Sequence, residues 1–141
     1  MDTKQKGDIT ELEVLTYITK LGYQVSIPFG DRQRYDQIWD INNNLLRVQV
    51  KTSRPCNGED AFAFSCKSNV RENGKTVYKK YSKDEIDYFA TCWNEKCYLI
   101  PVEECGTDKK LRLNKPKNNQ IKNISFAKDY EVEVVLEKYL Y

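Results

Sequence analysis

Residues 34–53 read RYDQIWDINNNLLRVQVKTS, and this stretch decides the fold. Residues 35–41 and 45–53 are rich in β-branched and aromatic side chains and predict two strands. Asparagine tolerates the left-handed backbone of a tight turn, so Asn42-Asn43-Asn44 predicts a hairpin between them. Side chains alternate along a strand, which places Gln49 and Lys51 together on the face opposite the neighbouring valines.

The polar face of this hairpin gathers groups that can hydrolyse a phosphodiester. The turn brings Asp36 alongside the strand that carries Gln49 and Lys51. Asp36 and Gln49 would offer oxygen ligands to a hard cation, Mg²⁺, for which Mn²⁺ could substitute. Lys51 could orient or deprotonate the attacking water, or neutralise charge in the transition state. The alternative is that Gln49 and Lys51 occupy the solvent face of an ordinary hairpin.

Upstream, residues 8–22 predict an amphipathic helix with Asp8 as its N-cap. Glu11 falls in the same helical sector as Leu15 and Ile18. A carboxylate in an apolar stripe is costly unless it is paired or bound to metal, so we expect Glu11 at the same metal site. The alternative makes Glu11 the third residue of a capping box with Asp8.

The amino-acid composition excludes several classes of enzyme. The 141 residues are 40% hydrophobic and 31% charged, which indicates one globular domain over residues 1–141. There is no histidine, which excludes Ser-His-Asp hydrolases, Cys-His proteases, HNH nucleases and HExxH metalloenzymes. No apolar run approaches the ~18 residues of a membrane helix. With no signal-peptide core at the N-terminus, we expect a cytoplasmic protein without a membrane partner.

The cysteines are odd in number and form no CxxC pair. This pattern predicts reduced thiols in a cytosolic protein, with a structural zinc site as the alternative. The five residues are Cys56, Cys66, Cys92, Cys97 and Cys105.

Two basic stretches lie behind a net charge of only +2. Residues 67–83 and 108–122 each carry six basic side chains against one acidic side chain. We expect the first stretch within a basic β-hairpin insertion, at about residues 61–83, that enters the major groove of DNA; the alternative is two solvated loops. The predicted DNA contacts are Lys67, Arg71, Lys75, Lys79 and Lys80 on the insertion, with Arg32 and Arg34 touching phosphates beside the site.

In this order the residues resemble the PD-(D/E)xK nuclease superfamily, and within it the group I intron homing endonucleases of the cyanobacterial type. The helix opens Gly7-x-x-x-Glu11, Tyr35-Asp36 stands in place of Pro-Asp, and Gln49-Val50-Lys51-Thr52 stands in place of Glu-x-Lys. Later segments match as well, so the resemblance covers about residues 7–105. They are Glu85-Ile86-Asp87-Tyr88-Phe89 and Tyr98-Leu99-Ile100-Pro101-Val102.

The resemblance implies an α/β fold with a central mixed β-sheet flanked by helices. It also implies metal-dependent cleavage of double-stranded DNA and assembly as a homodimer or homotetramer. The expected catalytic residues are Glu11, Asp36, Gln49 and Lys51, with the first three binding metal.

The departure from the family pattern is Gln49, because an amide weakens metal binding relative to a carboxylate. We therefore expect a site-specific DNA endonuclease and keep two alternatives. One is a structure-specific nuclease, such as a Holliday-junction resolvase or a restriction or repair nuclease. The other is a catalytically inactive DNA-binding module.

Overall fold

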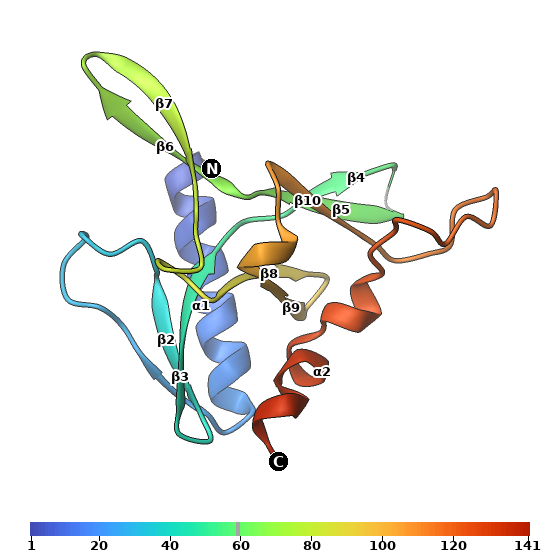
Figure 1. Cartoon of the computed structure of the whole chain (residues 1–141), viewed down its shortest axis with the longest axis horizontal. Coiled ribbons are helices and arrows are strands. Elements are labelled where there is room, and N and C mark those ends of the chain that lie inside the picture. The colour runs from blue at the N-terminus through green and yellow to red at the C-terminus, as the bar shows by residue number, and fades with distance from the viewer. Residues whose placement is uncertain (59) are drawn as a thin grey trace.

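A five-stranded sheet forms the centre of the protein (Figure 1). The computed structural model describes residues 1–58 and 60–141. The strand order is β1-β2-β3-β8-β9, with β3 and β8 parallel and the other neighbours antiparallel, which confirms the mixed sheet. The strands are β1 (Gln24–Ser26), β2 (Gln37–Ile41), β3 (Asn44–Val50), β8 (Tyr88–Trp93) and β9 (Lys96–Pro101).

The hairpin β2–β3 forms as its sequence predicts. Asn42 and Asn43 adopt φ of 51° and 72°, the left-handed conformation that asparagine tolerates. Trp39 on β2 pairs in register with Leu46 on β3, and both side chains are buried. The second strand ends at Val50, earlier than the predicted residue 53, because the chain then leaves the sheet.

Helix α1 (Thr3–Lys20) begins five residues before the predicted Asp8, so that part of the prediction was wrong. Its N-cap is Asp2, whose carboxylate accepts from the Gln5 N–H at 2.8 Å, while the Gln5 amide accepts from the Asp2 N–H at 3.2 Å. This capping box satisfies the first backbone donors. Asp8 therefore lies inside the helix, which excludes Glu11 as its capping partner.

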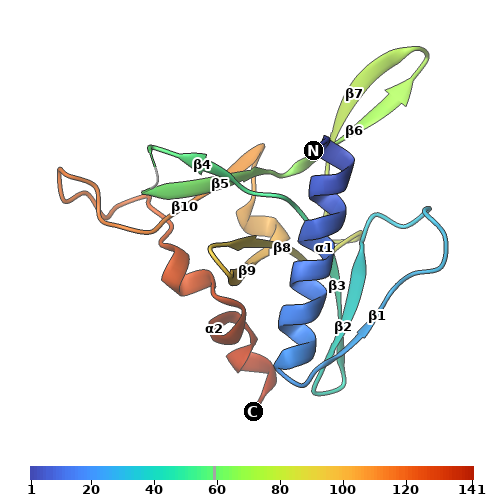
Figure 2. The ribbon, with the colours of Figure 1, turned by 180° about the vertical axis from the view of Figure 1, so that it is seen from behind.

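The two faces of the central sheet have different covers. Figure 2 shows α1 lying across the strands, and the short α2 (Val132–Leu136) packs into the same hydrophobic cluster. The other face is covered by a second sheet of order β10-β5-β4. Its strands are β4 (Arg54–Cys56), β5 (Ala61–Ser65) and β10 (Asp108–Arg112). Both helices thus flank one face, and a sheet takes the place of a helix on the other.

A two-stranded hairpin of β6 (Lys67–Glu72) and β7 (Lys75–Lys80) projects from the body (Figure 1). The predicted insertion at residues 61–83 was too wide. Residues 61–64 are all buried and pair with β4 and β10, and the phenylalanines among them belong to the core between the two sheets. At the C-terminal end, one-turn 3-10 segments at Ala127–Tyr130 and Glu137–Tyr139 flank α2, and another follows β9 at Val102–Glu104.

The cysteines depart from the expectation of reduced thiols. Cys92 and Cys97 face each other across β8 and β9 and form a disulfide, since their register places the two sulfurs within bonding reach. Cys56, Cys66 and Cys105 are free. Among the described residues no three Cys, His, Asp or Glu side chains cluster as a metal site, so the zinc alternative has no support. Within residues 1–58 and 60–141, no helix is long and apolar enough to cross a membrane.

Candidate active site

Asp36 is held by backbone on both sides. It immediately precedes β2, and its N–H donates to the Val48 carbonyl at 2.8 Å. Its carboxylate accepts from the Val50 N–H, also at 2.8 Å. Burial raises the pKa of Asp36, and the Val50 N–H and the Lys51 charge only partly oppose this rise. The hairpin therefore fixes one half-buried carboxylate against the strand that carries Gln49 and Lys51.

Glu11 extends this carboxylate site from the helix. Burial, together with the nearby charge of Asp36, raises the pKa of Glu11 to about 7. A proton on Glu11 relieves the repulsion between its carboxylate and that of Asp36. Glu11 therefore keeps its proton to a higher pH than an exposed glutamate does. A divalent cation placed between them would displace that proton.

Gln37 anchors the helix beside this pair. Its side-chain N–H donates to the Glu11 carbonyl at 3.1 Å, and its amide oxygen accepts from the Trp39 indole N–H at 2.9 Å. Gln37 is almost completely buried, so these two hydrogen bonds satisfy polar atoms that water does not reach. Sequence reasoning missed this residue. The available signal was a polar side chain at a core-facing position of the alternating strand.

Lys51 lies under the projecting hairpin. Its ammonium donates to the Lys67 carbonyl at 3.0 Å and sits 5.2 Å from the centroid of the Tyr81 ring. Burial lowers the pKa of Lys51, and the Asp36 carboxylate opposes this effect. A half-buried lysine with a lowered pKa can exchange protons with a neighbouring water. Gln49, two residues earlier, is half-buried and aligned in register with Phe89.

A cleft of about 550 Å³ opens between these residues and the hairpin. Asp36 and Gln49 line it from the central sheet, while Ser68, Val70 and Lys79 line it from β6 and β7. The segment 31–34 completes its rim. The cleft thus joins two of the candidate metal ligands, Asp36 and Gln49, to the base of the basic hairpin.

Arg34 connects the hairpin to the rim of the cleft. Its guanidinium donates to the Glu85 carboxylate at 2.9 Å, to the Lys80 carbonyl at 2.8 Å and to the Ser68 hydroxyl at 2.6 Å. It also stacks 3.8 Å from the centroid of the Tyr81 ring. The sequence-based expectation was a phosphate contact, but these interactions indicate that Arg34 holds the hairpin over the cleft. The missed signal was Glu85, a carboxylate 51 residues away in sequence.

The other predicted DNA contacts lie around the cleft and along the hairpin. Arg32 is exposed at the rim of the cleft. Lys79 pairs with Glu72 at 2.7 Å, and the Lys67 ammonium lies 4.5 Å from the centroid of the Tyr78 ring. The exposed hairpin members are Arg71, Lys75, Lys79 and Lys80, while Lys67 is half-buried. The structure therefore brings five predicted cations onto one projecting element.

The donor set fits a hard divalent cation. It consists of two carboxylates, Glu11 and Asp36, and one amide oxygen, Gln49. These are oxygen ligands of the kind that Mg²⁺ prefers. With only two acidic groups the site is less negative than one built from three carboxylates.

Comparisons with known proteins place the chain in a family. Residues 1–133 match the family model described as PD-(D/E)XK endonuclease. A solved structure of a bacterial homing endonuclease, I-Ssp6803I, superposes with a TM-score of 0.78 at 24% identity, covering 98% of this chain and 95% of that one. The protein TIC 214 of Adiantum capillus-veneris is 31% identical over 96 residues, which take in 54% of this chain and 6% of that protein. Because the family model spans nearly the whole chain, this protein belongs to the PD-(D/E)XK endonuclease family.

Proposed function

We propose that this protein is a Mg²⁺-dependent, site-specific endonuclease of the homing type that cuts double-stranded DNA. The observation that carries the proposal is the Asp36 carboxylate, which the Val50 N–H fixes at 2.8 Å and which lines one cleft with Gln49 at the base of a basic hairpin. Around it the pKa values of Glu11 and Asp36 are raised and that of the half-buried Lys51 is lowered, and shifts of this kind are frequent at reactive sites. The shared fold of the bacterial homing endonuclease supports the same assignment.

Each residue has a distinct role in this proposal. Glu11, Asp36 and the Gln49 amide hold the cation, and the hydrogen bond from the Val50 N–H keeps Asp36 oriented. Bound Mg²⁺ would acidify the attacking water and stabilise negative charge on the phosphate, as Mn²⁺ could. Lys51 orients that water and takes up or balances its proton.

The hairpin supplies the DNA interface. Its exposed cations Arg71, Lys75 and Lys80 reach beyond the body of the protein, where they can enter a major groove. Arg32 contacts a phosphate at the cleft, and Arg34 acts by bracing the hairpin. Long or palindromic DNA sites are usually read by paired subunits, so we propose a homodimer or homotetramer.

One observation favours a second candidate function. Gln49 contributes an amide where the family pattern has a carboxylate, and this loss of charge could leave a DNA-binding module without turnover. Such a module would bind DNA with strong salt dependence in the absence of any cleavage.

The test is cleavage of a random-sequence duplex library and of genomic DNA, followed by sequencing of all new ends. Reactions contain Mg²⁺ or EDTA, and Asp36→Asn is compared with Asp40→Asn, a matched change at the far end of the same strand. Ends clustered at one long motif, dependent on Mg²⁺ and on Asp36, would support the proposal. Ends scattered at branched or nicked DNA would indicate a structure-specific nuclease. Intact DNA with retained binding would identify the inactive module.

A further inference from the structure

A second basic surface lies on the outer face of the β4–β5–β10 sheet. The phenylalanines of β5 point into the core, so Ala61 and Ala63 point outward. The register places Lys110 opposite Ala63 and Arg112 opposite Ala61. Both alanines are buried, and each lies beside one of these long cross-strand neighbours. The charged ends of Lys110 and Arg112 are thereby carried at the surface of this sheet.

Lys110 and Arg112 also line a pocket of about 470 Å³ at the free edge of β10. Gln120 and Asn123 add amides to its lining, and the nearby Lys109 ammonium donates to the Glu104 carbonyl at 3.3 Å. None of the lining residues that the structure describes is acidic. Phosphate oxygens are acceptors that lysine, arginine and amide donors can bind together.

Backbone geometry adds a further donor to this pocket. The Arg112 N–H points away from β5 and donates to the Ser125 carbonyl at 2.9 Å. Alternate residues of an antiparallel strand direct their N–H groups to the same side, so the Lys110 N–H faces the same edge. The free edge of β10 therefore offers a fixed backbone donor beside the two cations of the outer face.

Few acidic side chains neutralise the positive charge of this surface. Asp108, the one acidic residue of the stretch 108–122, lies 3.7 Å from Arg54 on β4. Among the described residues, the ion pairs do not include Lys110 or Arg112. With its amide oxygen turned toward them, Asn57 accepts from Lys110 at 3.2 Å and from Arg112 at 2.9 Å, which positions both without neutralising them.

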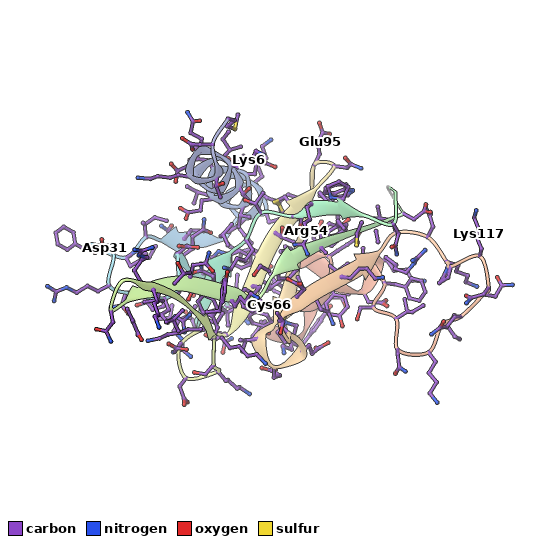
Figure 3. All side chains as sticks on the ribbon, turned by 90° about the horizontal axis from the view of Figure 1, so that it is seen from above. Lys6, Asp31, Arg54, Cys66, Glu95 and Lys117 are labelled. Carbon is purple, nitrogen blue, oxygen red and sulfur yellow. A yellow bond between two sulfur atoms is a disulfide. The ribbon has the colours of Figure 1, made fainter. Side chains whose placement is uncertain are left out.

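This surface and the hairpin lie on opposite sides of Lys51. Strand β5 continues through Cys66 into β6, and the Lys51 ammonium donates to the Lys67 carbonyl at that junction. Viewed from above, Figure 3 places Cys66 and Arg54 between Asp31 at one end and the loop of Lys117 at the other. A single elongated polyanion could therefore contact the hairpin, the cleft and the β10 pocket.

We propose that the outer face of the β4–β5–β10 sheet, centred on Lys110 and Arg112, binds the sugar–phosphate backbone of duplex DNA on the side of the scissile position opposite the hairpin. The inference rests on the proposed DNA-cleaving function and extends its substrate contact. Backbone contacts of this kind carry no sequence information, but they set register and add salt-dependent affinity.

The test measures binding of a random-sequence 30-base-pair duplex in EDTA as a function of salt concentration. Lys110→Gln and Arg112→Gln are combined, because glutamine keeps an aliphatic stem beside the alanines while it removes the charge. Loss of two phosphate contacts should flatten the slope of log K against log salt by about 1.8 and weaken binding roughly 10- to 30-fold near physiological salt. The charge-retaining pair Lys110→Arg and Arg112→Lys should restore both values, which a purely structural role would not predict.

Two comparison variants separate this inference from the proposed function. Lys20→Gln with Lys138→Gln removes two charges from the opposite end of the protein and should leave the slope unchanged. Lys75→Gln with Lys80→Gln removes two hairpin charges. If only the hairpin variant flattens the slope, the inference is overturned and the proposed function stands. If the wild type binds no DNA at all, both are overturned; if only the sheet variant has an effect, the inference holds and the hairpin assignment is wrong.

Discussion

Replacing Glu11 with glutamine is expected to stabilise the metal-free protein at pH 8 while it weakens Mg²⁺ binding. Burial, reinforced by the charge of Asp36, raises the pKa of Glu11 from 4.5 to about 7. The folded protein therefore holds this proton more tightly than the unfolded chain does. The resulting stability is fully present below pH 4.5 and is lost as the pH rises through 7. Glutamine does not titrate, so the variant escapes this loss.

The size of the effect follows from the two pKa values of Glu11. Each pKa unit corresponds to about 1.4 kcal/mol, so the rise from 4.5 to about 7 sets an upper bound of about 3 kcal/mol. Glu11 is only half-buried, and solvent screening reduces the expected difference to about 1–2 kcal/mol. The variant and the wild type should differ little in free energy of unfolding at pH 4.5. At pH 8 the variant should be more stable by that amount.

The assay is urea unfolding from pH 4.5 to pH 8 in EDTA, repeated with millimolar Mg²⁺. The matched control is Glu13→Gln, which removes an exposed carboxylate from the same helix and should follow the wild-type pH dependence. Mg²⁺ should stabilise the wild type at pH 8 and should stabilise the Glu11 variant much less. A Glu11→Gln protein whose stability follows the wild-type pH dependence would refute the proposed coupling of Glu11 with Asp36.

Three further expectations concern other parts of the molecule. Gln49→Glu should lower the Kd for Mg²⁺ at least about tenfold in calorimetry, because a third carboxylate joins the site; unchanged affinity would mean that residue 49 does not face the cation. Arg34→Ala should accelerate amide hydrogen exchange in β6 and β7 about tenfold or more, since it removes the charge-assisted bonds to Glu85 and the hairpin; Arg32→Ala should not. A thiol reductant should lower the free energy of unfolding by about 2 kcal/mol by opening the short Cys92–Cys97 loop, and a Cys92→Ser variant should be insensitive to it.

Local patterns account for what the sequence predicted well. The alternation around Val48 and Val50, and the left-handed asparagines at the turn, involve only neighbouring residues. They were sufficient to place Asp36 beside the strand of Gln49 and Lys51. Glu11 was placed near this site because its position in an apolar stripe required a partner, and Asp36 is that partner in the structure.

The features that sequence reasoning missed depend on distant parts of the chain. The start of α1 was misplaced because both Asp2 and Asp8 are good N-cap residues, and the choice depends on the reciprocal hydrogen bonds of Gln5. The alternating Ala-Phe pairs of β5 gave no indication of which strands would flank them. Long-range pairing of this kind is fixed by tertiary packing, so the second sheet and the role of Arg34 emerge only in three dimensions.

The neutral amide at position 49 is consistent with the raised pKa of Glu11 beside Asp36. A carboxylate there would add a third negative charge to a partly buried cleft. At an effective dielectric constant of about 20, like charges about 5 Å apart repel by about 3 kcal/mol. With Gln49, the metal-free site contains two carboxylates, and the raised pKa of Glu11 relieves their repulsion by favouring its protonated form. In the proposed metal site, Gln49 would supply a neutral oxygen ligand, and Glu11 and Asp36 would supply the negative charge that attracts the cation. The affinity for Mg²⁺ should therefore depend more steeply on pH than it would in a site of three carboxylates. It should also fall further when either carboxylate is removed.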